Sequence, residues 1–170
     1  MASQAIFGFI GVILGSLTTS VLTIYRERLA TRRELTIRDQ QYERDRKAAR
    51  DTFQRESILA LQSAVFDVIK AAYDELDRML AELRNTGNWP ARKWETPTAV
   101  GWSAAVLKLE SSRARVFDDG LRSLAEELRV VAGDAVWAET RDTAEQLSRP
   151  LELLQRKFQR GVTKVLPSLY

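Results

Sequence analysis

The chain has 170 residues, of which 45% are hydrophobic and 29% charged, and its net charge is +3. This composition is typical of a folded chain, and the length suits one domain with an appendage. The sequence contains neither Cys nor His. Their absence excludes disulfide scaffolds, Cys or His nucleophiles, Ser-His-Asp triads, zinc fingers, and haem or iron–sulfur sites with His or Cys ligands. No motif for carboxylate, Lys, Tyr or Ser/Thr chemistry stands out, so we predict no enzyme, no catalytic residue, no metal site and no cofactor.

The first 25 residues form the most apolar part of the chain. Residues 1–25 carry no charged side chain, and the stretch 6–25 is mostly apolar. As a helix, that stretch is about 30 Å long, which matches the hydrocarbon core of a bilayer. We therefore interpret residues 1–25 as a single transmembrane helix. A cleaved signal peptide and a buried core helix are the alternatives, but the start lacks the positive charge that a signal peptide carries.

Basic residues follow this segment directly. The N-terminal flank has no Lys or Arg, whereas the C-terminal flank carries Arg26, Arg28, Arg32 and Arg33. Because Lys and Arg resist translocation, we predict a single-pass protein of the cell membrane with its N-terminus outside and its C-terminal domain cytoplasmic. The same membrane-proximal basic residues suit contact with anionic lipid headgroups, at about 1 kcal/mol for each group near the surface.

Small residues recur on one face of the predicted span. Gly11 and Gly15 form a G-x-x-x-G match, which Thr19 and Thr23 extend at the same spacing. Small residues four apart let two helix backbones approach closely in lipid. We predict that these four residues form a helix-association face and that the chain is a homo-oligomer. The alternative is a single span that merely tolerates its glycines.

Residues 26–50 are highly charged, with nine basic and five acidic side chains and a net charge of +4, whereas residues 51–170 have a net charge of −1. No Gly or Pro interrupts residues 16–86, so we expect one helix to continue from the span as a charged juxtamembrane stalk. Leu35, Tyr42 and Ala49 only partly fit a coiled-coil heptad, which favours a solvated helical stalk over a long coiled coil and leaves weak pairing open. Interspersed acids and the lack of interleaved aromatic residues argue against nucleic-acid binding.

Residues 51–170 are predicted to form an all-α antiparallel helical bundle, because apolar residues recur at spacings of three and four and no segment alternates with period two. The first helix of this region carries an apolar stripe and stops at residues 85–88. The stripe comprises Ile58, Leu61, Val65, Phe66, Ile69, Ala72, Tyr73, Leu76, Met79, Leu80 and Leu83.

A second helix is predicted from about Thr98, and residues 118–120 interrupt or bend it. Its apolar positions are Trp102, Val106, Leu109, Val116 and Phe117. The apolar stripe then continues to Gly133, and a further helix is predicted from Asp134. Pro150 either kinks that helix or opens a new one with Ser148 as its cap.

The segment 88–97 is a candidate partner-binding loop, with Trp89, Arg92, Lys93 and Trp94 as its candidate contacts. Trp and Arg are common at binding hot spots. A structural role in covering the helix ends is the favoured interpretation, and a lipid contact is a third. Acidic groups at 74–77, 118–119 and 126–127 are expected to be ordinary surface charge rather than Mg²⁺ or Ca²⁺ ligands.

These features lead to two functional hypotheses. The first is a membrane-anchored protein-interaction or scaffolding module that self-associates and binds an unidentified cytoplasmic protein. The alternative is a membrane-active effector whose Gly-rich helix assembles into an oligomeric pore.

Overall fold

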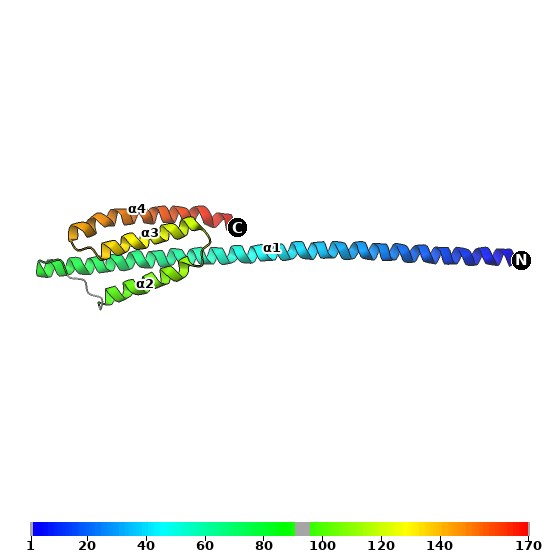
Figure 1. Cartoon of the computed structure of the whole chain (residues 1–170), viewed down its shortest axis with the longest axis horizontal. Coiled ribbons are helices and arrows are strands. Elements are labelled where there is room, and N and C mark those ends of the chain that lie inside the picture. The colour runs from blue at the N-terminus through cyan, green and yellow to red at the C-terminus, as the bar shows by residue number, and fades with distance from the viewer. Residues whose placement is uncertain (1, 91–95, 170) are drawn as a thin grey trace. The chain divides into compact units, whose positions relative to one another are not determined.

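The computed structural model describes the backbone of residues 2–90 and 96–169, and the side chains of residues 33–35, 37–90 and 96–169. The elements are α1 (Ala2–Thr86), α2 (Pro97–Arg113), α3 (Asp119–Val136), α4 (Arg141–Val165) and the short 3-10 helix η1 (Leu166–Leu169) (Figure 1). No strand occurs in the described residues, and the all-α prediction is confirmed. Internal contacts divide the chain into two units, residues 1–49 and 50–170.

The first unit contains only the N-terminal part of α1, up to residue 49. Every side chain described between residues 33 and 49 is exposed, including Leu35 and Tyr42. Arg38 Nη2 pairs with Glu34 Oε1 at 3.1 Å, one helical turn away. Across the side chains that the structure describes, we find no helix with an apolar stretch long enough to cross a bilayer. The predicted span at residues 1–25 lies outside those side chains.

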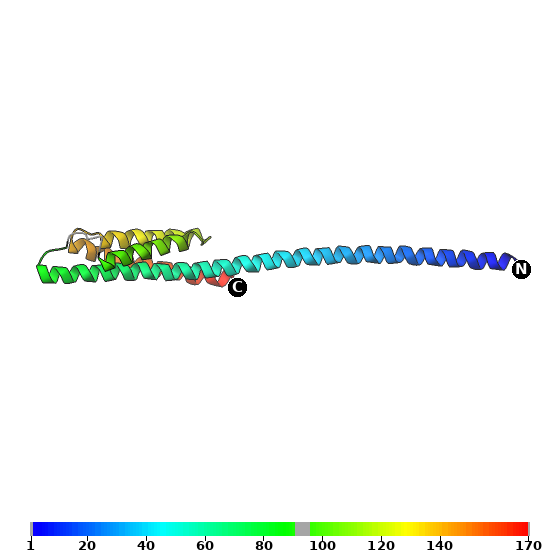
Figure 2. The same cartoon turned by 90° about the horizontal axis from the view of Figure 1, so that it is seen from below.

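The second unit is an antiparallel bundle in which residues 50–86 of α1 pack with α2, α3 and α4 (Figures 1 and 2). The predicted helical bundle is confirmed. All four helices contribute apolar side chains to one core. Its members include Ile58, Leu61, Val68, Trp102, Leu109, Leu121, Leu128, Leu151, Phe158 and Val162. The core therefore supplies the burial that each amphipathic helix needs.

Short polar residues set the helix boundaries. Gly87 has a φ of +73° and donates its N–H to the carbonyl of Leu83, which ends α1 with a left-handed glycine. The hydroxyl of Thr96 accepts the N–H of Ala99 at the start of α2. Asp118 and Thr140 cap α3 and α4 in the same way. The predicted stop at 85–88 and the predicted break at 118–120 are both explained by these caps.

The break before the last helix lies later than predicted. α3 continues through Gly133 to Val136, and α4 begins only at Arg141. A glycine inside a helix costs about 1 kcal/mol, which the burial of Ala132, Ala135 and Val136 outweighs.

Of the two alternatives for Pro150, the structure excludes the new helix that begins there with Ser148 as its cap. Pro150 lies inside α4 and opens no new helix. Ser148 is not a cap, because its hydroxyl donates to the carbonyl of Ala144 at 3.2 Å.

Two aromatic residues assigned to the apolar stripes are exposed. Phe66 is 58% exposed and Phe117 is 55% exposed. Phe66 follows Val65, and adjacent helical residues point about 100° apart, so only Val65 faces the core. Phe117 lies in the connection between α2 and α3 rather than in a helix.

Four charged side chains join α2 to α3. Arg113 contacts Glu110 at 2.7 Å and Glu126 at 2.6 Å, and Arg129 contacts Glu126 at 2.5 Å and Glu110 at 3.2 Å. The hydrogen bond from Arg129 is the main cause that lowers the pKa of Glu126, and the charges of Arg129 and Arg113 add to it. This network therefore favours the ionised carboxylate in the folded state.

The lowered pKa of Glu126 predicts an acid-sensitive contribution to stability. It is present above the pKa of the unfolded state, near 4.5, and is lost as the pH falls through the lower pKa of the folded state. We expect Glu126→Gln to be less stable than the wild type at pH 7 and the difference to disappear at lower pH. Urea denaturation at pH 7, 5 and 3.5 tests this. A difference that stays constant down to pH 3.5 would contradict it.

Candidate functional site

Only two of the sequence-predicted site residues have described side chains. Arg33 is exposed on α1. Trp89 is half-buried just after α1. The others lie outside the described side chains: Gly11, Gly15, Thr19, Thr23, Arg26, Arg28, Arg32, Arg92, Lys93 and Trp94. The helix-association face and most of the candidate loop therefore stay predictions.

The side chain of Trp89 is held by contacts with other parts of the bundle. Its indole Nε1 donates to the carbonyl of Ala138 at 2.9 Å. The ring also packs against a small apolar cluster that includes Met79 and Ala144. Trp89 thus joins the end of α1 to the connection between α3 and α4, in agreement with the interpretation that the loop covers helix ends.

Glu75 corrects the expectation that the acids at 74–77 are ordinary surface charge. Only 1% of Glu75 is exposed. Arg78 donates to it through Nη2 at 2.6 Å and Nε at 3.0 Å, and the hydroxyl of Thr98 also donates to it. The hydrogen bond to Glu75 is the largest cause that raises the pKa of Arg78. Arg78 also contacts Glu82 at 2.7 Å.

The location of Glu75 gives it a clear role. Its carboxylate links α1 to the first turn of α2, because Thr98 lies one residue after Pro97. A buried carboxylate is tolerated when it is paired and hydrogen-bonded, as this one is. Glu75 therefore acts as a structural anchor.

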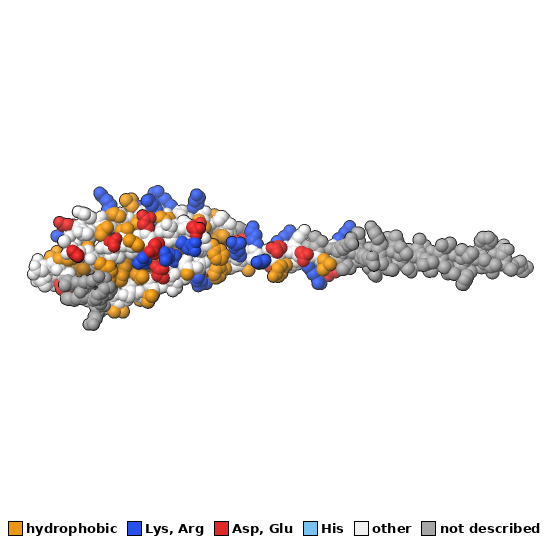
Figure 3. Space-filling view, viewed as in Figure 1, with side chains coloured by type: hydrophobic (Ala, Val, Ile, Leu, Met, Phe, Trp, Pro, Cys, Tyr) orange, Lys and Arg blue, Asp and Glu red, His pale blue; other side chains and the backbone are white. Residues whose placement is uncertain are grey.

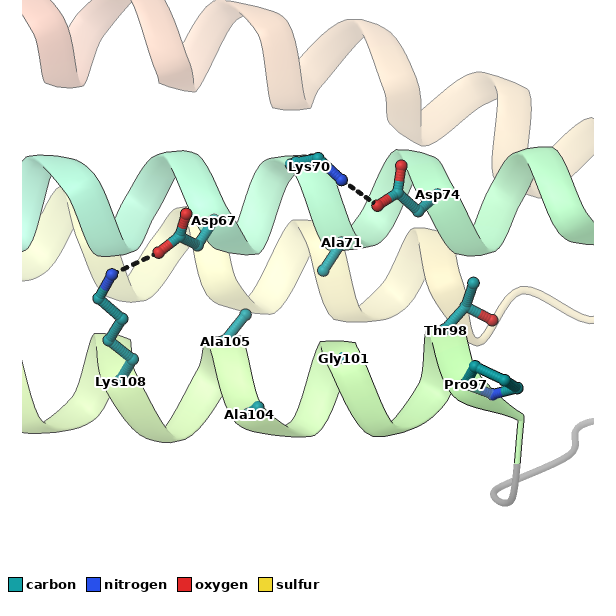
Figure 4. Close-up of a pocket in the computed structure, with 10 residues that line it drawn as sticks. All are labelled: Asp67, Lys70, Ala71, Asp74, Pro97, Thr98, Gly101, Ala104, Ala105 and Lys108. Atoms are coloured by element: carbon teal, nitrogen blue, oxygen red, sulfur yellow. Dashed lines mark hydrogen bonds and ion pairs between the residues drawn. The ribbon is translucent and has the colours of Figure 1, made fainter.

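A groove of about 480 Å³ lies between α1 and α2 (Figure 4). Small side chains line it, among them Ala71 of α1 and Gly101 and Ala105 of α2. Its charged side chains are paired, Lys70 with Asp74 at 2.5 Å and Lys108 with Asp67 at 2.6 Å. Each of these exposed charges is bound to its partner, so the charged side chains of the groove are not placed to act as a general acid or base.

Two phenylalanines and two arginines form a mixed surface cluster that the sequence pattern does not predict. The rings of Phe53 and Phe117 lie 6.2 Å apart between their centroids. Arg50 lies over the Phe117 ring at 5.4 Å and Arg115 over the Phe53 ring at 5.3 Å. Among the described residues, neither guanidinium forms an ion pair. We call these four residues the aromatic–arginine cluster.

A buried glutamine holds this cluster in place. Gln54 is 5% exposed; its Nε2 donates to the carbonyl of Arg115 at 3.1 Å, and its Oε1 accepts the N–H of Phe117 at 2.8 Å. Both backbone groups belong to the connection between α2 and α3. The clamp therefore fixes the residues that carry two of the four side chains. The sequence alone places Phe117 in the apolar stripe of the second helix and gives Phe53 no distinct pattern, so no local signal indicates the cluster.

Comparisons with known proteins give no further assignment. No family model, no curated protein and no solved structure gives a match to the chain. No group of three or more acidic side chains in the described part of the chain is placed to hold a metal ion.

The anchoring role of Glu75 is testable by substitution. We expect Glu75→Ala to lower the free energy of unfolding by about 2 kcal/mol, because it removes charged hydrogen bonds from a buried position. The matched control is Asp74→Ala, which removes an exposed ion pair and should cost less than about 1 kcal/mol. Urea denaturation followed by Trp fluorescence measures both. Equal losses of unfolding free energy in the two variants would contradict the structural role of Glu75.

Proposed function

We propose that the chain is a membrane-anchored protein-binding module whose bundle contacts a partner through the aromatic–arginine cluster. The observation that carries this proposal is the exposure of Phe53 and Phe117, at 38% and 55%, beside two arginines without carboxylate partners in the described residues. Aromatic residues and Arg are enriched at protein interfaces, where they contribute much of the binding energy.

The local structure favours binding with little loss of conformational entropy. The Gln54 clamp fixes the connection that carries Arg115 and Phe117. Ring and guanidinium contacts restrict the side chains further. Because ordering an interface costs free energy, a preorganised cluster loses less of it on binding. A partner surface with an acidic group beside an apolar pocket would complement both parts of the cluster.

The membrane anchor is proposed from the sequence of residues 6–25 and from the basic flank that starts at Arg26. Self-association is proposed through Gly11 and Gly15. The exposure of Leu35 and Tyr42 on α1 supports a helix that pairs with a second copy. Anchoring and pairing would present several aromatic–arginine clusters on one membrane, which raises avidity for a multivalent partner.

Site-specific photocrosslinking tests the binding site. A photoreactive residue at position 117 should form adducts in native membranes, and Arg115→Ala with Phe53→Ala should reduce their yield at least about fivefold. Leu107 is the matched control position, because it is an equally apolar and well-exposed residue on α2. Equal adduct yields at 107 and 117, or adducts that are unaffected by the two substitutions, would overturn the assignment.

Membrane extraction tests the anchor. The chain should stay in the pellet after alkaline carbonate treatment, and replacing Ile10, Val12 and Leu14 with Asp should release it, because charges at the centre of a span are costly. Release of the unchanged chain by carbonate would contradict the anchor. The same preparation, reconstituted in dye-loaded vesicles, separates the two functional hypotheses. Leakage that is lost in Gly11→Leu with Gly15→Leu would favour the oligomeric pore.

A further inference from the structure

The outward face of α4 is strongly basic. The buried side of this helix consists of Leu151, Leu154, Phe158 and Val162. On the opposite side, cations recur at helical spacing over about 22 Å of helix. We call these exposed residues the α4 basic face: Arg149, Arg156, Lys157, Arg160 and Lys164. Lys and Arg side chains gather along the α4 edge of the bundle in Figure 3.

Only part of the charge of this face is balanced by acidic neighbours, namely Glu152 beside Arg156 and Asp142 and Glu145 near Arg149. Arg156 approaches Glu152 at 4.0 Å, the limit of an ion pair between exposed groups. Within the described residues, the other four cations of the face form no ion pair. No acidic residue follows Glu152 in the sequence. By contrast, Arg113 of α2 and Arg129 of α3 are both paired with carboxylates of the network between these two helices. The α4 basic face therefore has an excess of positive charge.

An apolar residue lies in the middle of the face. Leu153 is 54% exposed and falls between Arg149 and Arg156 on the same side of α4. Cations around an exposed leucine suit the boundary of a bilayer, where basic groups contact anionic headgroups and an apolar side chain enters the acyl region. A nucleic-acid backbone would use the cations but gains nothing from the leucine, and no aromatic residue is available on this face for base stacking.

We propose that the α4 basic face binds the surface of an anionic lipid bilayer. This contact is separate from the predicted span and from the membrane-proximal arginines at 26–33. It rests on the proposed anchor only for its location in the cell, since anionic vesicles test it directly. Bound in this way, the bundle would lie with α4 against the lipid, and α2, on another side of the core, would remain accessible to a partner.

A single-cysteine experiment tests the proposal on the full chain, which has no native Cys. Leu153→Cys carries a polarity-sensitive fluorophore, and Ser111→Cys on an exposed site of α2 is the control. The chain is mixed with vesicles of phosphatidylcholine alone or with phosphatidylglycerol added. We expect the label at 153 to shift to the blue and to be protected from an aqueous quencher only with anionic vesicles. The label at 111 should stay exposed in both.

Charge variants test whether the cations of the α4 basic face cause the protection of the label at 153. Arg160→Gln with Lys164→Gln should lower the ratio of lipid-protected to exposed label at 153 by about tenfold or more, because each cation contributes near the surface. The matched control is Lys70→Gln with Lys108→Gln, which removes two exposed cations between α1 and α2 and should leave that ratio unchanged. Circular dichroism confirms that each variant keeps its helical content.

Three outcomes would overturn the proposal: an exposed label at 153 with anionic vesicles, equal protection by both vesicle types, or protection by duplex DNA without protection by anionic vesicles. The last outcome would assign the face to nucleic acid. Failure of the anchor gives a different result. In that case the chain would not float with phosphatidylcholine vesicles, whereas the label at 153 would still respond to phosphatidylglycerol.

Discussion

The apolar stripe on the second half of α1 is the constraint on which the bundle depends. From Ile58 to Met79 this face places a series of apolar side chains against the core, with the buried Glu75 as the one polar member between them. Such a face is unfavourable in water, and helices in proteins gain most of their stability by burying it. α2, α3 and α4 are each shorter than α1 and cover it together through residues such as Trp102, Leu128 and Phe158.

Apolar burial alone does not fix how four helices pack, because apolar contacts are not directional. Two buried polar side chains of α1 supply direction. Gln54 binds the backbone between α2 and α3, and Glu75 binds Thr98 at the start of α2. A shifted packing would leave Gln54 without its two backbone partners and Glu75 without Thr98, with only Arg78 of the same helix still bound to it. An unsatisfied buried polar group costs about 1–3 kcal/mol. The two residues lie 21 positions apart on α1, so together they select one alignment of α2.

The sequence predicts the fold class well and the details less well, for physical reasons. Apolar spacing identifies the helices, because apolar residues that recur every three and four positions share one face, which can be buried from water, only when the segment is helical. Helix ends were predicted where glycine or a capping residue forces a stop, as at Gly87 and Asp118. Sequence spacing puts the break after α3 too early, because the local cost of Gly133 is smaller than the free energy gained by burying the residues that continue the helix. Tertiary packing decides such cases.

The candidate sites were harder to predict because they depend on contacts between distant segments. Phe53 and Phe117 are 64 positions apart, and nothing local to either one indicates a ring contact or a guanidinium above it. From the sequence, Glu75 is predicted to be surface charge like Asp74, because its contact with Thr98 depends on how α2 packs against α1. The basic residues of α4, in contrast, share one helix face by their spacing alone. Their proposed role in lipid binding depends on the structure. Only the packed bundle shows which cations are paired with carboxylates, such as Arg113 and Arg129, and which cations are left to bind a charged surface.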